Sequence, residues 1–476
     1  MERLTPLATA FLDAEDVDPR ASLAIGSMAV FEGPAPSFED FVAHIAGRLP
    51  LIPRYRQKLA TVPFGLSAPG WVDDPGFDIR WHVRNTALPA PGGPEEIGRL
   101  MSRVMSRRMD RDRPLWEYWF CEGLADGRWG LLSKLHHSLA DGVSGTDIYQ
   151  LVLDPTPTPR PPVPDDWTPA APPSRTAAAA GAAWQLATSP VTVARAVVTS
   201  LTDPRRLART ARETARGLVT MVPALRPVEH TSLTGPLEGS RRYTWTDVSL
   251  EDVRVVRRRH GVTVNDVALA AVSGGFRVLL MSRGEEPGAH ALRSLVPVST
   301  REPGAESIPD NRVSLMLPYL PVELADPVER LTAVRDRVRD LREGREPEAG
   351  GSVTAAAEIA PFPPVAWGIR LGLRLPQRHI ATVTTNVPGP RTTLYALGRE
   401  AQAMLPYVPI ADRVRIGVAM FSYRDTLTFG LTGDYDTAPD LQVLADGIAA
   451  SLAELVAVSR QAPGTGRGSE DASRTR

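Results

Sequence analysis

The chain has 476 residues, of which 43% are hydrophobic and one is cysteine, and its formal net charge is −1. This length predicts two domains, the single cysteine excludes an internal disulfide, and the near-zero charge gives no overall attraction to nucleic acid. No uninterrupted apolar run reaches the ~18 residues of a membrane-spanning helix, and residues 1–19 contain no secretory signal pattern, so we expect a cytoplasmic protein that contacts a membrane surface at most.

The first 154 residues are predicted to form a mixed α/β unit. Short apolar runs are typical of buried strands, and apolar residues repeated every three or four positions are typical of helices with one buried face. Ser37 is a suitable N-cap for the first helix. The predicted strands are residues 22–31, 116–124 and 128–135, and the predicted helices are residues 38–49 and 95–109.

Two adjacent histidines, His136 and His137, follow the third predicted strand, and Asp141 and Gly142 come shortly after them. Residues 143–153 have the apolar spacing of a helix, so the histidines lie where a strand gives way to a helix. Successive side chains of a strand point to opposite faces, so one ring should face a cavity and the other should face protein. A neutral imidazole near pH 7 is well suited to accept a proton from a hydroxyl group.

Other chemistries fit these residues less well. Adjacent histidines point apart, and the sequence contains no His-Glu-x-x-His pattern and no cysteine pair, so we expect no metal site. Ser138 and Ser144 lie nearby, but no Gly-x-Ser-x-Gly elbow surrounds them or Ser273, and nothing marks Cys121 as activated. A structural pair of histidines at the end of a strand is the remaining alternative.

The second predicted unit follows a connector. Residues 155–185, rich in proline and alanine, are predicted to be a linker, and residues 186–460 a helical connector followed by the second half. Arginines in the connector indicate either a membrane-binding face or the solvated face of a helix between domains. Residues 461–476 are predicted to be a disordered tail. The expected strands are residues 241–248, 291–298, 380–385, 415–423 and 426–432, and the expected helices are residues 267–283, 327–343 and 441–458.

Two polar residues, Asn265 and Asp266, come directly before the predicted helix at residues 267–283. Both are favoured N-cap residues, but capping explains only one of them. A role other than helix capping therefore stays open for one of these two residues.

The His-His-x-x-x-Asp-Gly motif resembles the signature of the acyltransferase superfamily that includes chloramphenicol acetyltransferase and the condensation domains of peptide synthetases. The rest of the chain is similar to one branch, the bacterial wax ester synthase/acyl-CoA:diacylglycerol acyltransferases. The resemblance implies a mixed α/β fold of two chloramphenicol acetyltransferase-like halves with the active-site channel between them. It rests on an ordered set of segments: residues 4–15, 71–74, 77–78, 114–117, 264–267, 296–301, 385–390 and 421–423.

The resemblance also implies roles for the motif residues. His137 is expected to be the general base, and His136, Asp141 and Gly142 complete the catalytic set. Asp141 is expected to orient the loop through an ion pair, for which Arg301, at the end of a predicted strand of the second half, is the expected partner.

Substrate-binding roles are expected for residues near the channel. The resemblance places Asn265 near the acyl acceptor and Trp116 near the channel, although Trp116 also suits a core position. Ser299 and Arg301 are the further substrate-binding candidates, and backbone N–H groups near Gly142 or the Asn265 side chain are candidates for stabilising an oxyanion.

The implied function is that of an acyl-CoA-dependent O-acyltransferase that makes triacylglycerol from diacylglycerol, wax esters from long-chain alcohols, or both. The acyl group would pass directly from acyl-CoA to the acceptor, with no cofactor beyond this co-substrate. Expected partners are long-chain acyl-CoA, diacylglycerol or fatty alcohol, and the inner membrane face or the lipid-droplet surface. The alternatives are an acyltransferase with another hydroxyl acceptor, such as a polyketide, or a carrier-bound donor, and a catalytically inactive lipid-binding relative.

Overall fold

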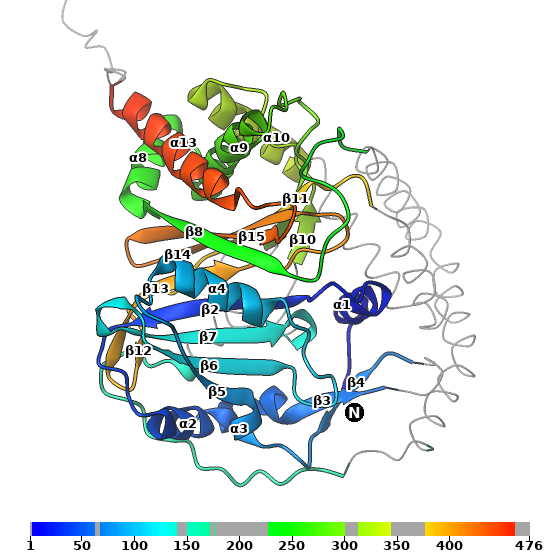
Figure 1. Cartoon of the computed structure of the whole chain (residues 1–476), viewed down its shortest axis with the longest axis vertical. Helices are drawn as coiled ribbons and strands as arrows, with labels where there is room; N and C mark the ends of the chain where they lie inside the picture. The colour runs from blue at the N-terminus through cyan, green and yellow to red at the C-terminus, as the bar shows by residue number, and fades with distance from the viewer. Residues whose placement is uncertain are drawn as a thin grey trace, which may run out of the picture.

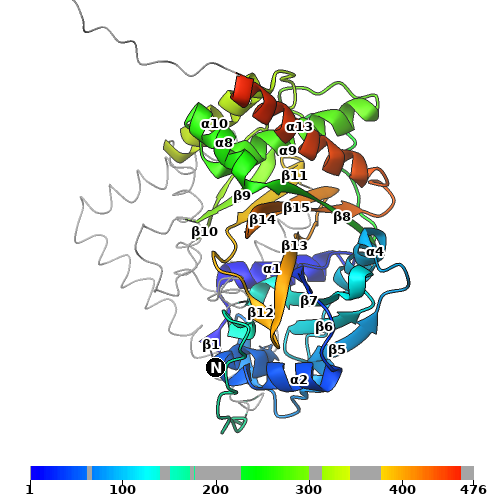
Figure 2. The same cartoon turned by 90° about the vertical axis from the view of Figure 1, so that its left-hand side faces the viewer.

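The computed structural model describes residues 2–61, 67–139, 149, 151–171, 176, 227–299, 313–343 and 377–461. Its described part contains two six-stranded sheets, which lie one above the other in Figures 1 and 2. The helical connector up to residue 226 and the tail from residue 462 lie outside the described residues, as do the sequence candidates Asp141, Gly142 and Arg301.

The lower sheet in Figure 1 has the strand order β12-β13-β2-β7-β6-β5. Its central strand β7 is buried at every residue, as the apolar run predicted. The three strands predicted in this half are present, with bounds within two residues of those expected. The strands are β2 (Ala24–Phe31), β5 (Val83–Ala87), β6 (Trp116–Glu122), β7 (Trp129–His136), β12 (Tyr395–Ala396) and β13 (Arg399–Tyr407).

Helices surround this lower sheet, and Ser37 caps α2 as predicted, accepting a hydrogen bond from the Asp40 backbone N–H at 3.1 Å. In Figure 1, α2 and α3 lie below the sheet, α4 lies between the two sheets, and α1 lies at the end of β7. A small three-stranded sheet lies beside them. These elements are α1 (Pro6–Val17), α2 (Phe38–Ala46), α3 (Ile79–His82), α4 (Pro94–Met105), β1 (Glu2–Arg3), β3 (Gln57–Ala60) and β4 (Gly70–Asp73).

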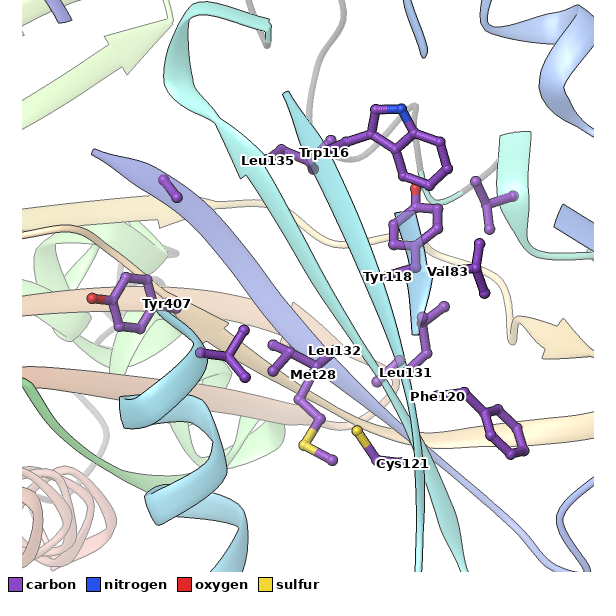
Figure 3. Close-up of a cluster of buried hydrophobic side chains, with 14 of the residues drawn as sticks. Met28, Val83, Trp116, Tyr118, Phe120, Cys121, Leu131, Leu132, Leu135 and Tyr407 are labelled. Atoms are coloured by element: carbon purple, nitrogen blue, oxygen red, sulfur yellow. The ribbon is translucent and has the colours of Figure 1, made fainter. Parts of the chain in front are cut away.

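The core of this half lies on both faces of the lower sheet (Figure 3). Trp116, Tyr118 and Phe120 of β6 project from one face of the sheet, while Met28 of β2 and Leu132 of β7 project from the other face, toward α4. All five side chains are at most 2% exposed. Dense packing on both faces fixes β7 and therefore the residues at its end.

The upper sheet has the strand order β10-β9-β11-β14-β15-β8, and helices cover its outer face (Figure 1). The helix predicted at residues 327–343 is present with those bounds, and the predicted hairpin is the antiparallel pair β14–β15. The elements are β8 (Arg241–Ser249), β9 (Ser294–Ser299), β10 (Val313–Met316), β11 (Thr382–Val387), β14 (Ile416–Tyr423), β15 (Thr426–Asp434), α8 (Leu250–His260), α9 (Val264–Ser282), α10 (Pro327–Glu343) and α13 (Leu441–Gln461).

Two of these helices, α9 and α13, are long and apolar enough to cross a membrane by length and composition alone. They instead pack closely on each other, and a Cβ added to Gly447 of α13 would lie 3.0 Å from the Cα of Gly275 in α9. In the most apolar window of α9, 72% of the residues are buried, as is usual for the core helix of a globular half.

The second half contributes a pair of strands to the sheet of the first half. Residues 395–407, which the sequence analysis placed in the second half, form β12 and β13, and β13 pairs antiparallel with β2 of the lower sheet. The lower sheet is therefore not built from residues 1–154 alone. Tyr243 of β8 adds a further link, because its hydroxyl donates to the Pro406 carbonyl at 2.9 Å.

A second junction joins α4 to β8. Gly98 of α4 lies against the Tyr243 backbone, and a Cβ at Gly98 would be 2.7 Å from the Tyr243 carbonyl oxygen. Beside this contact, the Arg241 backbone N–H donates to Ser106 Oγ at 2.9 Å. The absence of a side chain at Gly98 thus sets how closely the two halves approach.

Gly98→Val should lower the free energy of unfolding by about 1–3 kcal/mol, the usual cost of overpacking. The added atoms meet a backbone carbonyl, which cannot move away as a flexible side chain would. Urea titration of the purified variants measures this loss. Gly239→Val is the matched control, because nothing lies within 4 Å of a Cβ built at Gly239; equal stability of the two variants would contradict the tight junction.

Candidate active site

The ring of His137 lies at the boundary between β7 and a short 3₁₀ turn, His137–Leu139. Its backbone N–H donates to the Leu23 carbonyl at 3.2 Å, and its ring stacks on Phe11 of α1 with centroids 4.0 Å apart. His137 is half-buried, whereas the rest of this turn is buried. The ring is therefore held on one face while it keeps access to solvent.

The neighbouring ring of His136 is enclosed by protein and only 1% exposed. Its Nδ1 accepts a hydrogen bond from the Ser138 backbone N–H at 3.1 Å and lies 2.7 Å from Ser138 Oγ. Its Nε2 lies 3.4 Å from Glu15 Oε1. The two rings thus lie in different surroundings, one half-buried and one enclosed by protein.

Glu15 of α1 is the buried carboxylate behind the histidine pair, and sequence reasoning did not identify it as a site residue. Its Oε1 accepts from the Leu23 backbone N–H at 2.8 Å, and its Oε2 accepts from Arg111 at 3.0 Å. Burial alone would raise the pKa of Glu15, but the hydrogen bond and charge of His136, followed by those of Leu23 and Arg111, lower this pKa to about 2. Glu15 therefore anchors both His136 and the segment whose carbonyl holds the His137 N–H.

The protonation state of His137 suits a base. Burial of the ring, together with the nearby charge of His136, lowers the pKa of His137 to about 4. The imidazole is therefore neutral at pH 7, with a nitrogen lone pair able to accept a proton.

On the other half, the N-terminus of α9 differs from the cap predicted at Asn265 and Asp266. The N-cap is Thr263, whose hydroxyl accepts from the Asp266 N–H at 3.2 Å, while the Asp266 carboxylate accepts from the Thr263 N–H at 2.9 Å. Asn265 takes no part in this capping box. Its Oδ1 instead accepts from Asn386 Nδ2 at 3.2 Å, which leaves the Asn265 amide group oriented.

Asn386 is a second residue that sequence reasoning did not assign to the site, although residues 385–390 are among the segments that carry the family resemblance. It lies near the carboxyl end of β11, which runs parallel to both β9 and β14. Parallel strands end at the same edge of a sheet, so Ser299, the last residue of β9, ends at this edge too. No hydrogen bond or ring contact joins Asn265 to either histidine in the described part of the chain.

Trp116 belongs to the core of the first half and is fully buried. Its ring is stacked between Tyr55 and His82, with centroids 4.5 and 4.6 Å away, and its indole N–H donates to the Tyr55 carbonyl at 2.8 Å. The preceding residue, Leu115, accepts a hydrogen bond from the His136 backbone N–H at 3.0 Å. The Trp116 segment is thus a direct neighbour of the histidine pair.

Within the described ranges, no three histidine, cysteine, aspartate or glutamate side chains gather in a way that could hold a metal ion. Cys121 is buried, and burial raises the pKa of its thiol to about 12, so it is not an activated nucleophile at neutral pH.

Comparison with known proteins decides the family. Residues 4–268 match the wax ester synthase/diacylglycerol acyltransferase catalytic domain, and residues 310–456 match the C-terminal domain of the same proteins. The chain belongs to the wax ester synthase/diacylglycerol acyltransferase family. The family expected from the histidine motif and the ordered segments is thereby confirmed, and with it the acyltransferase class of enzyme.

Relatives of this acyltransferase cover almost its entire length. A protein of Mycobacterium tuberculosis named probable diacylglycerol O-acyltransferase tgs1 is 44% identical over 465 residues, which is 97% of each chain. The solved wax ester synthase/diacylglycerol acyltransferase from Marinobacter aquaeolei VT8 is 27% identical, with a TM-score of 0.67 over 97% of this chain and 100% of that one.

The first condensation domain of the CDA synthetase is 16% identical to this acyltransferase, with a TM-score of 0.59 over 96% of each chain. This likeness concerns the fold alone. It confirms the expected mixed α/β architecture of two chloramphenicol acetyltransferase-like halves.

The acyltransferase should lose stability as the pH falls below about 6.5, the usual pKa of histidine. Burial lowers the pKa values of His44 and His82, and lowers that of His137 to about 4, so the unfolded chain binds protons that the folded chain does not. Below about pH 4.5, Glu15 adds to the loss, because its carboxylate stays ionised in the fold down to a pKa of about 2.

Thermal melts at pH 7 and pH 5 measure this dependence. The midpoint should be lower at pH 5, and the difference should shrink in His44→Gln, which removes one of the buried neutral imidazoles. A midpoint that stayed constant or rose on acidification would contradict the direction of these shifts.

Proposed function

We propose that this acyltransferase transfers a long-chain acyl group from acyl-CoA to the hydroxyl of diacylglycerol, of a long-chain alcohol, or of both, with His137 as general base. The observation that supports this most strongly is the half-buried, neutral imidazole at the end of β7 in a chain that matches the family over residues 4–268 and 310–456. The name of the mycobacterial relative supports diacylglycerol as an acceptor, and the family description supports wax esters as a product.

In the proposed reaction, the neutral His137 ring takes the proton of the acceptor hydroxyl. The oxygen attacks the thioester carbonyl carbon, the C–S bond of the tetrahedral intermediate breaks, and the CoA sulfur leaves with the proton returned by the imidazolium. No acyl-enzyme forms, so both substrates are bound together. A positioned base of this kind contributes typically ~10²–10⁴-fold to the rate.

The oxyanion formed in this reaction needs hydrogen-bond donors. Asn265 is our candidate on the second half, because Asn386 fixes its amide oxygen and its NH₂ group has no acceptor among the described residues. Backbone N–H groups near Gly142 are the other candidates. The ion pair between Asp141 and Arg301 stays a prediction, tested by the activity of Asp141→Ala.

We also propose that the protein works at a lipid surface, as a peripheral protein of the inner membrane face or of lipid droplets. Diacylglycerol and long-chain alcohols dissolve in membranes rather than in water, so the enzyme has to reach them there. Co-sedimentation with liposomes that contain dioleoylglycerol tests this location, and the protein remaining in the supernatant would contradict it.

A substrate panel with purified protein tests the function. Palmitoyl-CoA is combined in turn with dioleoylglycerol and with hexadecanol, thiol release is followed, and the lipid products are identified by mass spectrometry. Acceptor-dependent thiol release with triacylglycerol or wax ester as product is the expected result. Lipid binding without thiol release would instead favour the inactive relative.

A further inference from the structure

A pocket of about 310 Å³ opens on the first half, on the α4 side of the lower sheet. It lies between α3, the end of α4, the start of β6 and the following strand β7, and His137 is not part of its lining. Two carboxylates, Asp110 and Glu117, line it. Six cationic side chains also line it: Arg84, Arg103, Arg107, Arg108, Arg113 and Lys134.

Some of these cations already have partners. The Lys134 ammonium donates to the backbone carbonyls of Val104, at 2.8 Å, and Arg107, and the Arg108 guanidinium donates to backbone carbonyls of the α1 end and the loop after it. The charged groups of these two side chains are therefore already bound to backbone carbonyls.

The rim of the pocket consists of guanidinium groups stacked on indole rings. The Arg113 guanidinium lies 3.8 Å from the ring centroid of Trp81, and the Arg84 guanidinium lies 5.4 Å from Trp81 and 5.3 Å from Trp119. Their nearest carboxylate oxygens are 3.6 Å away, beyond good hydrogen-bond distance. Stacking fixes a guanidinium while leaving its in-plane N–H groups able to bind an anion.

Two cations have no partner at all in the described part of the chain. The side chains of Arg103 and Arg107 are exposed at the pocket and make no ion pair or hydrogen bond with a described residue. Positive charge without a matching carboxylate, beside a concave surface, is the arrangement that binds phosphate groups.

His82 adds an independent indication of a ligand. It lines the pocket and is 1% exposed, and its Nδ1 donates to the Trp116 carbonyl at 2.8 Å. Its Nε2 is buried and has no hydrogen-bond partner among the described residues. Because Nδ1 is the donor, Nε2 of the neutral ring carries a lone pair, so this unpaired atom calls for a hydrogen-bond donor there, such as a water molecule or a hydroxyl group of a ligand.

The pocket lies directly beside the candidate catalytic histidines. Pro114 and Trp116 line it, and the residue between them, Leu115, accepts the hydrogen bond from the His136 backbone N–H. Lys134 lies two residues before His136 on the same strand. The pocket therefore adjoins the strand end that carries the two histidines.

We propose that this pocket binds the phosphate groups at the nucleotide end of the acyl-CoA donor, with Arg103 and Arg107 as their principal ligands. This inference rests on the proposed function, since it assigns the donor a place on the first half. Guanidinium forks match phosphate oxygens in two-point contacts, and phosphate held here leaves the thioester end of the donor free to reach His137.

The test uses the Arg103→Gln/Arg107→Gln double variant, which keeps both side chains polar and exposed. Its KM for palmitoyl-CoA should rise by about tenfold or more, as expected from losing two charge-assisted hydrogen bonds. Its kcat should stay close to that of the parent, and its KM for S-palmitoyl-N-acetylcysteamine, a thioester without a nucleotide, should not change. Its affinity for adenosine 3′,5′-bisphosphate, measured by calorimetry, should fall by a similar factor.

The matched control is Arg254→Gln/Arg257→Gln, which removes two exposed arginines of α8 on the second half and should leave all these values unchanged. An equal rise in KM for both thioesters, or unchanged affinity for adenosine 3′,5′-bisphosphate, would overturn the proposal. Loss of binding to phosphatidylglycerol vesicles with unchanged bisphosphate affinity would overturn it in favour of a lipid headgroup. Arginine-dependent binding of the bisphosphate by a protein that transfers no acyl group would leave the pocket standing and refute the proposed function.

Discussion

Replacing His137 with alanine should lower the rate of CoA release from palmitoyl-CoA by ~10²–10⁴-fold, whichever acceptor is used. The imidazole is the only group that our proposal assigns to the acceptor proton, and its lowered pKa keeps it in the basic form at neutral pH. The fold should survive, because the ring is half-buried and stacking on Phe11 is its one ring contact among the described residues. Thiol titration and a thermal melt on the same sample measure both quantities.

The acid side of the pH–rate profile gives a second test of His137 as the base. The value of kcat/KM should persist well below pH 6.5 and fall with an apparent pKa near 4, since protonation removes the base. Because stability also declines in acid, rates should be taken from short assays after a jump from pH 7. Parent-like activity in His137→Ala would exclude this residue as the base.

His136→Ala serves as the neighbouring control. It removes a buried ring that contacts Ser138 and Glu15 rather than solvent, so its main defect should be in stability. A larger loss of activity than in His137→Ala, with an intact fold, would show that the roles of the two rings are reversed.

Glu15→Ala should lower the free energy of unfolding by roughly 3–5 kcal/mol, the range for breaking a buried ion pair from one side. The carboxylate is 2% exposed, and its loss leaves the Leu23 N–H without its acceptor and Arg111 without its buried partner. Urea titration measures the loss. A change below about 1 kcal/mol, the range of a surface ion pair, would contradict the anchoring role.

The Glu15→Gln variant distinguishes a role of Glu15 in positioning the histidines from a role in stability alone. The amide keeps the size and can still accept from Leu23, but it removes the negative charge next to the His136 ring. Because Glu15 acts on His137 through its neighbours, the variant should lower kcat with little change in KM for palmitoyl-CoA. A rise in KM alone would instead indicate a role in substrate binding.

Much of the fold was predictable because its signals are local. The helix at residues 327–343 and the hairpin of β14 and β15 follow from apolar spacing and a two-residue turn, and both are present. β13 was not predicted, because its segment contains Glu400, Ala401 and Ala403, which have low strand propensity, and also Pro406. Its pairing with β2, more than 360 positions away, stabilises a strand that its own residues indicate only weakly.

The residues of the candidate site likewise fall into those that the sequence indicates and those that only the folded structure brings together. His136 and His137 stand out in the sequence because they are adjacent and precede Asp141 and Gly142. Glu15 could not be identified in this way, since it reaches His136 only through the packing of α1 against the end of β7. The capping box at Thr263 was missed because Asn265 and Asp266 are equally good caps by residue type, and only the backbone shows which residue begins the helix.

The contribution of β12 and β13 to the first half has a consequence for how the protein is made. A ribosome has synthesised more than four fifths of the polypeptide before residues 399–407 emerge, and until then one edge of β2 has no partner. Unpaired edges template association with other chains, so the nascent protein passes through a long period in which chaperones would find a binding site. For the same reason, a gene fragment ending at residue 154 should yield insoluble material rather than a separable module.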